Sequence, residues 1–480
     1  MVRVFRIDEP DLFFGGNEKC LDPQVGLLNY GPHGGGSLDP EARIKIRAGL
    51  IGTNRSLGTT EVWLSRLRNR IQAEQVTKTE YKGIDFPGLS QDGPLRFGIE
   101  IDENCVLRID RSFVRKLKEE KSRKKRILMA VQEYCARYDD MLEAHPPPQI
   151  VLLPIDDALF KLCKDPHRKT EKIIYQQREF GDPDAATAPL FDFHHYLKAQ
   201  AAVRGFVTQL LTPGTLVFSS RKQSAALIAW NFAVAAYYKA TGIPWKLAEI
   251  DNETCYIGVS FYQEGEVMRA SIAQVYMRTG ESQVIRGEPF EWDQDQRGRS
   301  VHLESSQMAE VIRKSVNIYE RQRKRLPQRV VVHKSTVFFD EEIEGCERAC
   351  NNIDELDIIH LPEWNTFRAY HEKYSYPVVR GTTIGDSQEA MLFSTGYVPA
   401  LGTYPGPAAP APLHLTCQRL DTSLETACWD ILGLTKLDWN TSTFYRRMPV
   451  TIGVSGKVGD IMAEMRAIKE SPPNSYKFYM

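Results

Sequence analysis

Two apolar stretches, at 43–53 and 149–156, most constrain what this chain can fold into. RIKIRAGLIGT at 43–53 predicts a buried strand. SLGTTEVWLSRLRNRIQAE at 56–74 predicts an amphipathic helix that follows this strand. QIVLLPID at 149–156 is an apolar strand of the buried parallel type. A strand, a glycine turn and a helix begin a βαβ unit. The alternation across residues 43–250 therefore predicts a doubly wound α/β domain.

The second half of the chain predicts another mixed sheet. Residues 254–292 contain three strands joined by short turns, which is typical of an antiparallel meander. A helix, a strand, a helix and a strand follow, at 302–326, 328–338, 341–353 and 356–363. The turn-rich residues 1–42 predict an extended lead-in packed on the core, rather than a helix or a regular sheet.

Composition sets the class of protein. The chain has 480 residues, enough for two to three domains, and Lys+Arg of 61 against Asp+Glu of 62 leave it almost neutral. Any nucleic-acid site must then be a local groove. The nine cysteines include no CxxC pair, so we expect free thiols in a reducing compartment. We find no signal peptide and no apolar run of about 20 residues that could span a bilayer. We therefore expect a cytoplasmic protein.

Four polar side chains between 194 and 239 form a candidate anion site. His194 and Lys198 are spaced i, i+4 on a predicted helix, Gln209 follows a second apolar run, and Lys239 ends another helix. Two lysines, a histidine and an amide suit an anion with several oxygens, such as a terminal phosphate. Such residues are also common as scattered polar positions on helix surfaces.

The order and spacing of these four residues resemble the guide 5′-phosphate pocket in the MID domain of Argonaute proteins. GLLNYGP at 26–32 and GIPWKL at 242–247 resemble the family's lead into MID and the end of MID. The resemblance covers roughly 10–480 and is to short prokaryotic Argonautes. It implies a lead-in (1–42), a Rossmann-like MID domain (43–250) and an RNase H-like PIWI domain (251–480). It also implies Mg²⁺ beside the phosphate, held by Gln209 and the carboxylate of Met480.

The resemblance also shows what is missing. Argonautes that cut use metal ions held by four side chains, mostly acids, and two-metal cleavage needs converging carboxylates. Here Ser260 and Ser335 stand at two of these positions, and Val454 or Ser455 at a third. The other acid of the set lies on a loop that we cannot place in this sequence. We therefore expect no nuclease activity in this chain.

The function implied by the resemblance is guide-directed recognition. A short 5′-phosphorylated guide RNA would pair with complementary single-stranded DNA, and base pairing would supply the sequence specificity. An APAZ-domain effector protein, carrying a TIR, sirtuin-like or nuclease domain, would form a heterodimer with this chain. Target binding would activate the effector against phages or plasmids. A larger oligomer of the complex after activation is an open alternative. The candidate residues for contacts with the phosphate backbone of the nucleic acid are Arg221, Lys222, Lys436 and Arg446.

Two alternatives stay open at this point. The chain could be a stand-alone metal-dependent nuclease of RNase H type with an unrecognised carboxylate set. It could also be an α/β enzyme of small molecules, although no nucleophile or cofactor loop is visible. Neither a GxGxxG loop nor another dinucleotide fingerprint follows the first strand.

Overall fold

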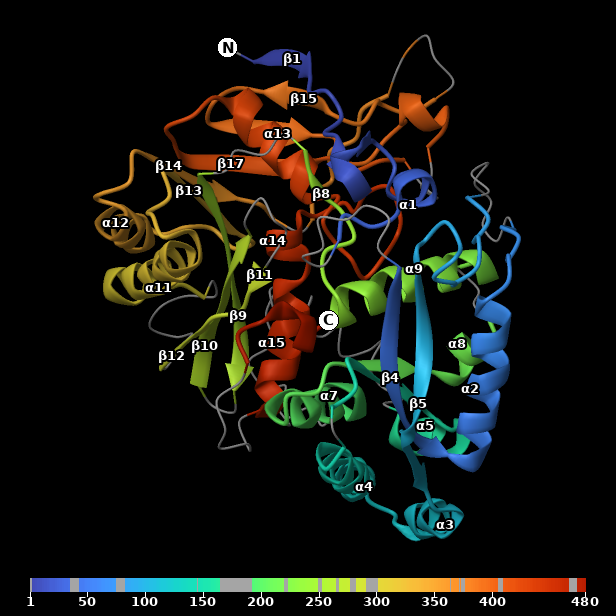
Figure 1. Ribbon diagram of the computed structural model, residues 1–480. Coiled ribbons are helices and arrows are strands. Elements are labelled where there is room, and N and C mark those ends of the chain that lie inside the picture. Colours follow the sequence, from blue (N-terminus) through green and yellow to red (C-terminus); the bar gives the residue numbers. More distant parts are fainter. Residues whose placement is uncertain are drawn as a thin grey trace.

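Two sheets organise the structure, a computed structural model of residues 1–480 (Figure 1). It describes the chain except for residues 1, 35–42, 75–82, 145, 165–191, 220–222, 249–252, 265–266, 277–281, 291–300, 363, 371, 373–375, 405–408 and 466–472.

The first sheet is parallel and has the order β5–β4–β6–β7. Its strands are Phe97–Ile109, Ile44–Thr53, Ile150–Pro154 and Thr208–Leu211, in the same order. Helices cover both faces, as the alternation of strand and helix predicts. They are α2 (Asn54–Leu67), α8 (Pro213–Leu216) and α9 (Ala225–Ala240) on one face, and α3 (Arg111–Glu119), α4 (Arg123–Leu142), α5 (Asp157–Cys163) and α7 (Phe193–Val203) on the other.

Two details of this half go beyond the predicted alternation of strand and helix. Strand β5 is one long strand, although its pairing with β4 shifts register between Ile101 and Val106. The charged stretch that follows it is divided into two helices, α3 and α4. The division falls where Glu120 adopts an extended conformation and the Ser122 hydroxyl caps the second helix.

In the described residues the second sheet has ten strands, in the order β1–β15–β16–β17–β14–β13–β9–β10–β11, with β12 paired to β10. The strands are Arg3–Arg6, Thr382–Gly385, Glu389–Leu392, Leu413–Leu420, Glu355–His360, Arg329–Lys334, Thr254–Glu264, Val267–Tyr276, Ser282–Gln283 and Arg286–Phe290 (β12). Strand β13 is parallel to both β9 and β14, whereas β10 is antiparallel to β9. The predicted meander and the strands that follow it are confirmed.

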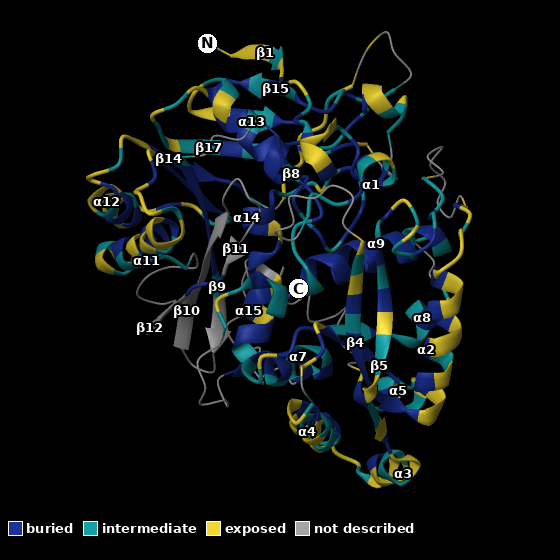
Figure 2. Cartoon of the chain, in the orientation of Figure 1, coloured by how far each residue is buried: buried dark blue, intermediate teal, exposed yellow. Residues whose placement is uncertain are grey.

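Helices also cover both faces of this larger sheet. Those on the outer face are α11 (Ser305–Arg323) and α12 (Asp340–Ala349), which share a core with β9, β13 and β14. Those on the inner face are α13 (Leu424–Leu434), α14 (Val450–Gly453) and α15 (Ser455–Glu464). Figure 2 shows yellow exposed positions along α2 and α12, whereas α14 is mostly blue.

The lead-in is more regular than predicted. Besides β1, it contains β2 (Leu12–Phe13), β3 (Lys19–Cys20) and a helix, α1 (Pro23–Tyr30). Asp22 caps that helix through the amides of Gln24 and Val25, and Pro23 stands at its first position, where a missing amide hydrogen costs nothing. The expectation of an extended segment was therefore wrong, because these turn-forming residues are a helix start.

The lead-in also joins the two halves of the chain. Strand β1 extends the ten-stranded sheet through β15, and β2 pairs with β8 (Lys246–Leu247) at the end of the first half. One hydrophobic cluster runs from α2, α9 and β4 to α13, α14 and α15. None of the helices that the structure describes is long and apolar enough to cross a membrane.

Candidate functional site

The four predicted pocket residues come from three elements of the first half. Asp192 caps α7 by accepting from the amides of His194 and His195, which starts the helix that carries His194 and Lys198. Gln209 lies on β7 and Lys239 in the last turn of α9.

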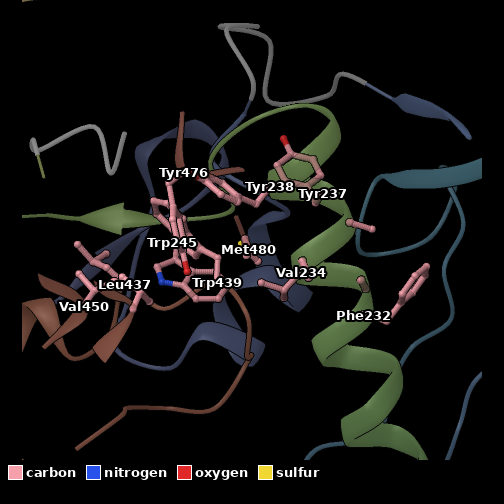
Figure 3. Packing of buried hydrophobic residues seen from close by; sticks show 14 of the residues in the cluster. Phe232, Val234, Tyr237, Tyr238, Trp245, Leu437, Trp439, Val450, Tyr476 and Met480 are labelled. Carbon is pink, nitrogen blue, oxygen red and sulfur yellow. The ribbon is translucent and has the colours of Figure 1, made fainter. Parts of the chain in front are cut away.

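Hydrogen bonds show that part of this set converges. The Lys239 ammonium donates to Oε1 of Gln209 at 2.6 Å, and the Lys198 ammonium donates to the main-chain oxygen of Met480. Figure 3 shows Met480 among buried side chains, between Trp439 and Val234 of α9. Residues 282 positions apart thus meet at Lys198, which no sequence periodicity could show.

Both lysines are buried, with exposed fractions of 7% for Lys198 and 3% for Lys239. Six lysines and arginines are buried in the described part of the chain, namely Lys198, Lys239, Arg329, Lys334, Arg380 and Lys436. The last four each form an ion pair with a carboxylate. Among the residues that the structure describes, Lys198 and Lys239 have no carboxylate side chain within ion-pair distance.

The pKa values reflect the burial of these two charges. Burial, and then the charge of Lys457, lowers the pKa of Lys198 to about 7. Burial, and then the charge of Lys198, lowers the pKa of Lys239 well below its ordinary value. Two buried cations that share at most one carboxylate, that of Met480, favour an anion that supplies further negative charge.

Lys457 is a candidate residue of the phosphate site that the sequence alone did not indicate. It lies exposed in the first turn of α15, a helix that packs against α7, and its charge acts on Lys198. Lys457 follows Val454, which stands at a position of the missing acids, by three residues. Its distance of 259 positions from Lys198 left no local signal.

His194 lies at the open end of α7. It is half-buried and its ring lies 5.4 Å from that of His195. Asp192, His194 and His195 bring one potential metal-ligating atom each within 4.8 Å of one another. Asp192 already serves as the helix cap, so this cluster has a structural explanation.

The residues predicted to contact the nucleic-acid backbone lie in different environments. Lys436 is fully buried and pairs with Glu9 at 3.1 Å while donating to the main-chain oxygen of Pro10 at 2.8 Å. The expectation that Lys436 reaches a phosphate was therefore wrong, because its charge is used inside the protein. Arg446 is partly exposed and pairs with Asp438 at 3.2 Å. Arg221 and Lys222 lie outside the described residues.

The positions of the missing acids gather on the second sheet. Val259 of β9 pairs with Lys334 of β13 in parallel register, so Ser260 and Ser335 are the next residues on these neighbouring strands. Helix α14, which directly precedes Val454, packs against both strands, and Thr451 bonds to His333 at 2.9 Å. The three positions thus share one region that presents hydroxyl and alkyl groups.

A buried ion pair stands beside this region. Lys334 donates to Oε1 of Glu342 at 2.6 Å, and Glu342 also accepts from the amides of Leu303 and Phe339. These bonds fix α12 to β13 and use the carboxylate fully, so Glu342 serves the fold.

The residues predicted to hold Mg²⁺ have suitable chemistry. Gln209 offers an amide oxygen and Met480 a main-chain oxygen, which are the hard ligands that Mg²⁺ prefers. Each oxygen already accepts from a lysine ammonium, so Mg²⁺ would share these oxygens with the two lysines. The ligand types therefore fit the ion, provided that a phosphate supplies further oxygens.

No protein-family model and no curated protein matches this chain in sequence. Solved structures do match in fold. Clostridium butyricum Argonaute bound to a guide DNA and a 19-mer target DNA is 13% identical, with a TM-score of 0.65 over 96% of this chain and 53% of that chain. Aa-Ago with externally bound siRNA is 13% identical, with a TM-score of 0.58 over 99% and 56%.

A. aeolicus Argonaute, also 13% identical, gives a TM-score of 0.57 over 98% of this chain and 55% of that chain. The chain thus spans about half the length of these Argonaute structures. Its two sheets and their helices have the mixed α/β fold of the MID and PIWI half of Argonaute proteins.

Proposed function

We propose that this chain binds the 5′-phosphate of a short guide strand, an RNA, and presents it for pairing with complementary single-stranded DNA. The observation that carries the proposal is the pair of buried lysines, Lys198, whose ammonium donates to Met480, and Lys239, which bonds to the Gln209 amide and has no carboxylate partner among the described residues. A terminal phosphate dianion supplies the charge and the acceptor oxygens that these ammonium groups need. His194 lies four residues before Lys198 on α7 and is half-buried, and the charge of the exposed Lys457 acts on Lys198.

A binding assay with matched guides tests this assignment. The full chain is titrated with one RNA sequence carrying either a 5′-phosphate or a 5′-hydroxyl. We expect at least about a tenfold preference for the phosphate, equivalent to about 1.4 kcal/mol. Replacing Lys198 and Lys239 by Ala should abolish that preference. The control is Lys45→Ala, which removes an exposed lysine from β4. Equal affinity of the wild-type chain for both guides would refute the assignment.

Mg²⁺ belongs to the same proposal. Gln209 and Met480 would hold the ion, which when bound would neutralise phosphate charge. We expect chelation to weaken binding of the 5′-phosphorylated guide and to leave the 5′-hydroxyl guide unaffected. Gln209→Leu should remove the Mg²⁺ dependence. Identical affinities with and without chelator would exclude the ion.

We further propose that the chain does not cut its target. Ser260, Ser335 and Val454 provide no carboxylate at their shared region, and ions there would lack charge compensation. Incubating the guide-loaded chain with labelled target and Mg²⁺ or Mn²⁺ should leave the target intact. Cleavage by the purified chain would favour the stand-alone nuclease instead.

A protein that binds its target without cutting it needs a separate effector protein. We propose a cytoplasmic heterodimer with an APAZ-domain protein whose TIR, sirtuin-like or nuclease domain is activated on target binding, as defence against phages or plasmids. The support is the resemblance to short prokaryotic Argonautes. Co-expression with the product of the neighbouring open reading frame should give a stable complex. Separate elution of the two proteins would contradict the partner.

A further inference from the structure

An aromatic segment leaves the second sheet beside the positions of the missing acids. It begins after β14, whose last residue, His360, bonds through Nε2 to the main-chain oxygen of Ser335 at 3.3 Å. Trp364 is four residues after His360, so its Cα atom lies within about 14 Å of the Cα atom of His360. Neither the candidate phosphate site nor the missing acids account for this segment.

Three aromatic side chains within seven residues are exposed here. Trp364 is 74% exposed, Tyr370 73% and Phe367 37%. Single exposed apolar residues are ordinary on protein surfaces. Trp364 and Tyr370, however, are the two most exposed large hydrophobic side chains of the described residues, and they belong to one short segment.

The backbone between these rings is held in place. Asn365 donates from Nδ2 to the main-chain oxygen of Pro412 at 2.7 Å and accepts from the amide of Phe367 at 3.1 Å. The Phe367 ring packs near Phe393, with 6.4 Å between centroids. A fixed backbone presents exposed rings at less entropic cost to a ligand than a free loop would.

Positive charge accompanies the rings. Arg368 donates to the main-chain oxygens of Phe367 at 2.6 Å and Asn365 at 3.3 Å, and no carboxylate of the described residues pairs with it. Arg447 donates to the same Pro412 oxygen at 3.0 Å, which places a second guanidinium beside Asn365. Both groups are cations next to aromatic rings.

We propose that Trp364 and Tyr370, with Arg368, form a stacking surface for unpaired bases of the target strand. Exposed aromatic rings accept any base face, and neighbouring guanidinium groups contact the phosphates of a single strand. Arg368 is exposed and has no carboxylate partner among the described residues, so it adds the positive charge that a nucleic-acid strand attracts. The location beside the guide–target path rests on the proposed function.

The test uses the full chain loaded with a 5′-phosphorylated guide. Two DNA targets are compared, one that matches the guide alone and one with an added unpaired oligothymidylate tail at either end. We expect a tail to tighten binding to the wild-type chain. Trp364→Ala with Tyr370→Ala should remove that gain, about five- to a hundredfold, because stacking contributes on that scale per base. Trp364→Phe should keep most of it.

Controls separate this surface from the phosphate site. Val62→Ala removes an exposed apolar side chain from α2 and should keep the gain. Retention of the guide should be unchanged in the aromatic variants, so a lost guide indicates failure of the proposed function instead. Free oligothymidylate then tests the surface alone, by quenching of tryptophan fluorescence that disappears in Trp364→Phe. An equal gain from the tail in the double alanine variant, or quenching that persists without Trp364, would overturn the proposal.

Discussion

Lys198 and Lys239 differ from the other buried cations of the described chain in having no Asp or Glu side chain as a partner, and Lys198 contacts Met480 instead. Lys334 and Lys436 are buried as deeply, but Glu342 and Glu9 neutralise them. The lysines could be recognised in the sequence, but their ion-pair partners could not. Partners such as Glu9 and Lys436 lie 427 positions apart. The sequence therefore pointed to the two lysines of the candidate site and also assigned Lys436 to a surface that it does not reach.

Methionine substitutions distinguish the two kinds of buried lysine. Lys239→Met removes an uncompensated charge, so we expect the free energy of unfolding to be kept or raised while phosphate-dependent guide binding is lost. Lys334→Met leaves Glu342 buried and unpaired, and should lower the free energy of unfolding by about 3–5 kcal/mol. Denaturant unfolding of both variants checks the contrast. Equal destabilisation by the two changes would mean that Lys239 also serves the fold.

Guide binding should depend on pH through Lys198. Because its pKa is lowered to about 7, the free folded protein loses this proton above pH 7, whereas the unfolded chain keeps it to about 10.5. The stability of the free protein therefore rises with pH between these values. A bound phosphate needs the charged lysine, so affinity should fall above pH 7, by up to about tenfold per pH unit for each proton taken up.

Anisotropy titrations with a 5′-phosphorylated guide between pH 6 and 9 measure this dependence. Above pH 6 the terminal phosphate is mostly a dianion, so its own titration does not produce the fall. Lys198→Arg keeps a charge that does not titrate in this range and should flatten the profile. The lowered pKa of Lys239 acts in the same direction and leaves a residual slope. A wild-type affinity that is constant from pH 7 to 9 would contradict the role of Lys198.

At the scale of elements, local pattern predicted the strands and helices but not how they meet. The apolar runs at 43–53 and 149–156 became β4 and β6, since burial on both faces favours continuous apolar strands. Helix α1 was missed, because its start uses Asp22 and Pro23, residues that also form turns. The approach of α14 to β9 could not be predicted, because it depends on a contact between Gly258 and Thr451.

Gly258→Ala tests that contact. A Cβ at 258 would lie 2.0 Å from the main-chain oxygen of Thr451, so α14 or β9 must move. We expect the free energy of unfolding to fall by about 1–3 kcal/mol, the usual range for overpacking. Thermal unfolding measures the loss, and Gly58→Ala on α2, where an added Cβ meets nothing within 4 Å, is the control. Equal melting temperatures for the two variants would show that the helix does not depend on this approach.

At the scale of the whole molecule, the lead-in brings a charged side chain as well as strands to the junction of the two halves. Glu9 contacts Arg380 at 2.8 Å and Lys436 at 3.1 Å. The Arg380 guanidinium also donates to the oxygens of Leu432 and Thr435. Trp245, at the end of the first half, donates to the main-chain oxygen of Lys436 at 2.9 Å. One carboxylate of the lead-in thus supports the junction of both halves, so we expect them to unfold together.

Glu9→Gln should therefore weaken the entire protein. The change leaves two buried cations without a counterion, and we expect a loss of about 3–5 kcal/mol in a single transition. Burial alone would raise the pKa of Glu9, but the charges of Arg380 and Lys436 lower it below 4.5. The contribution of Glu9 is thus complete above pH 4.5 and is lost as the pH falls through its lowered value.

The wild-type chain and the variant should accordingly converge in stability under acid conditions and differ most near neutral pH. Glu425→Gln, which breaks the exposed pair with Arg3, is the matched control and should change stability by less than about 1 kcal/mol. Calorimetry from pH 3 to 8 measures both variants. Two separate transitions in Glu9→Gln would mean that the halves fold independently, whereas one transition at lower temperature follows from a shared core in which this carboxylate is the common counterion.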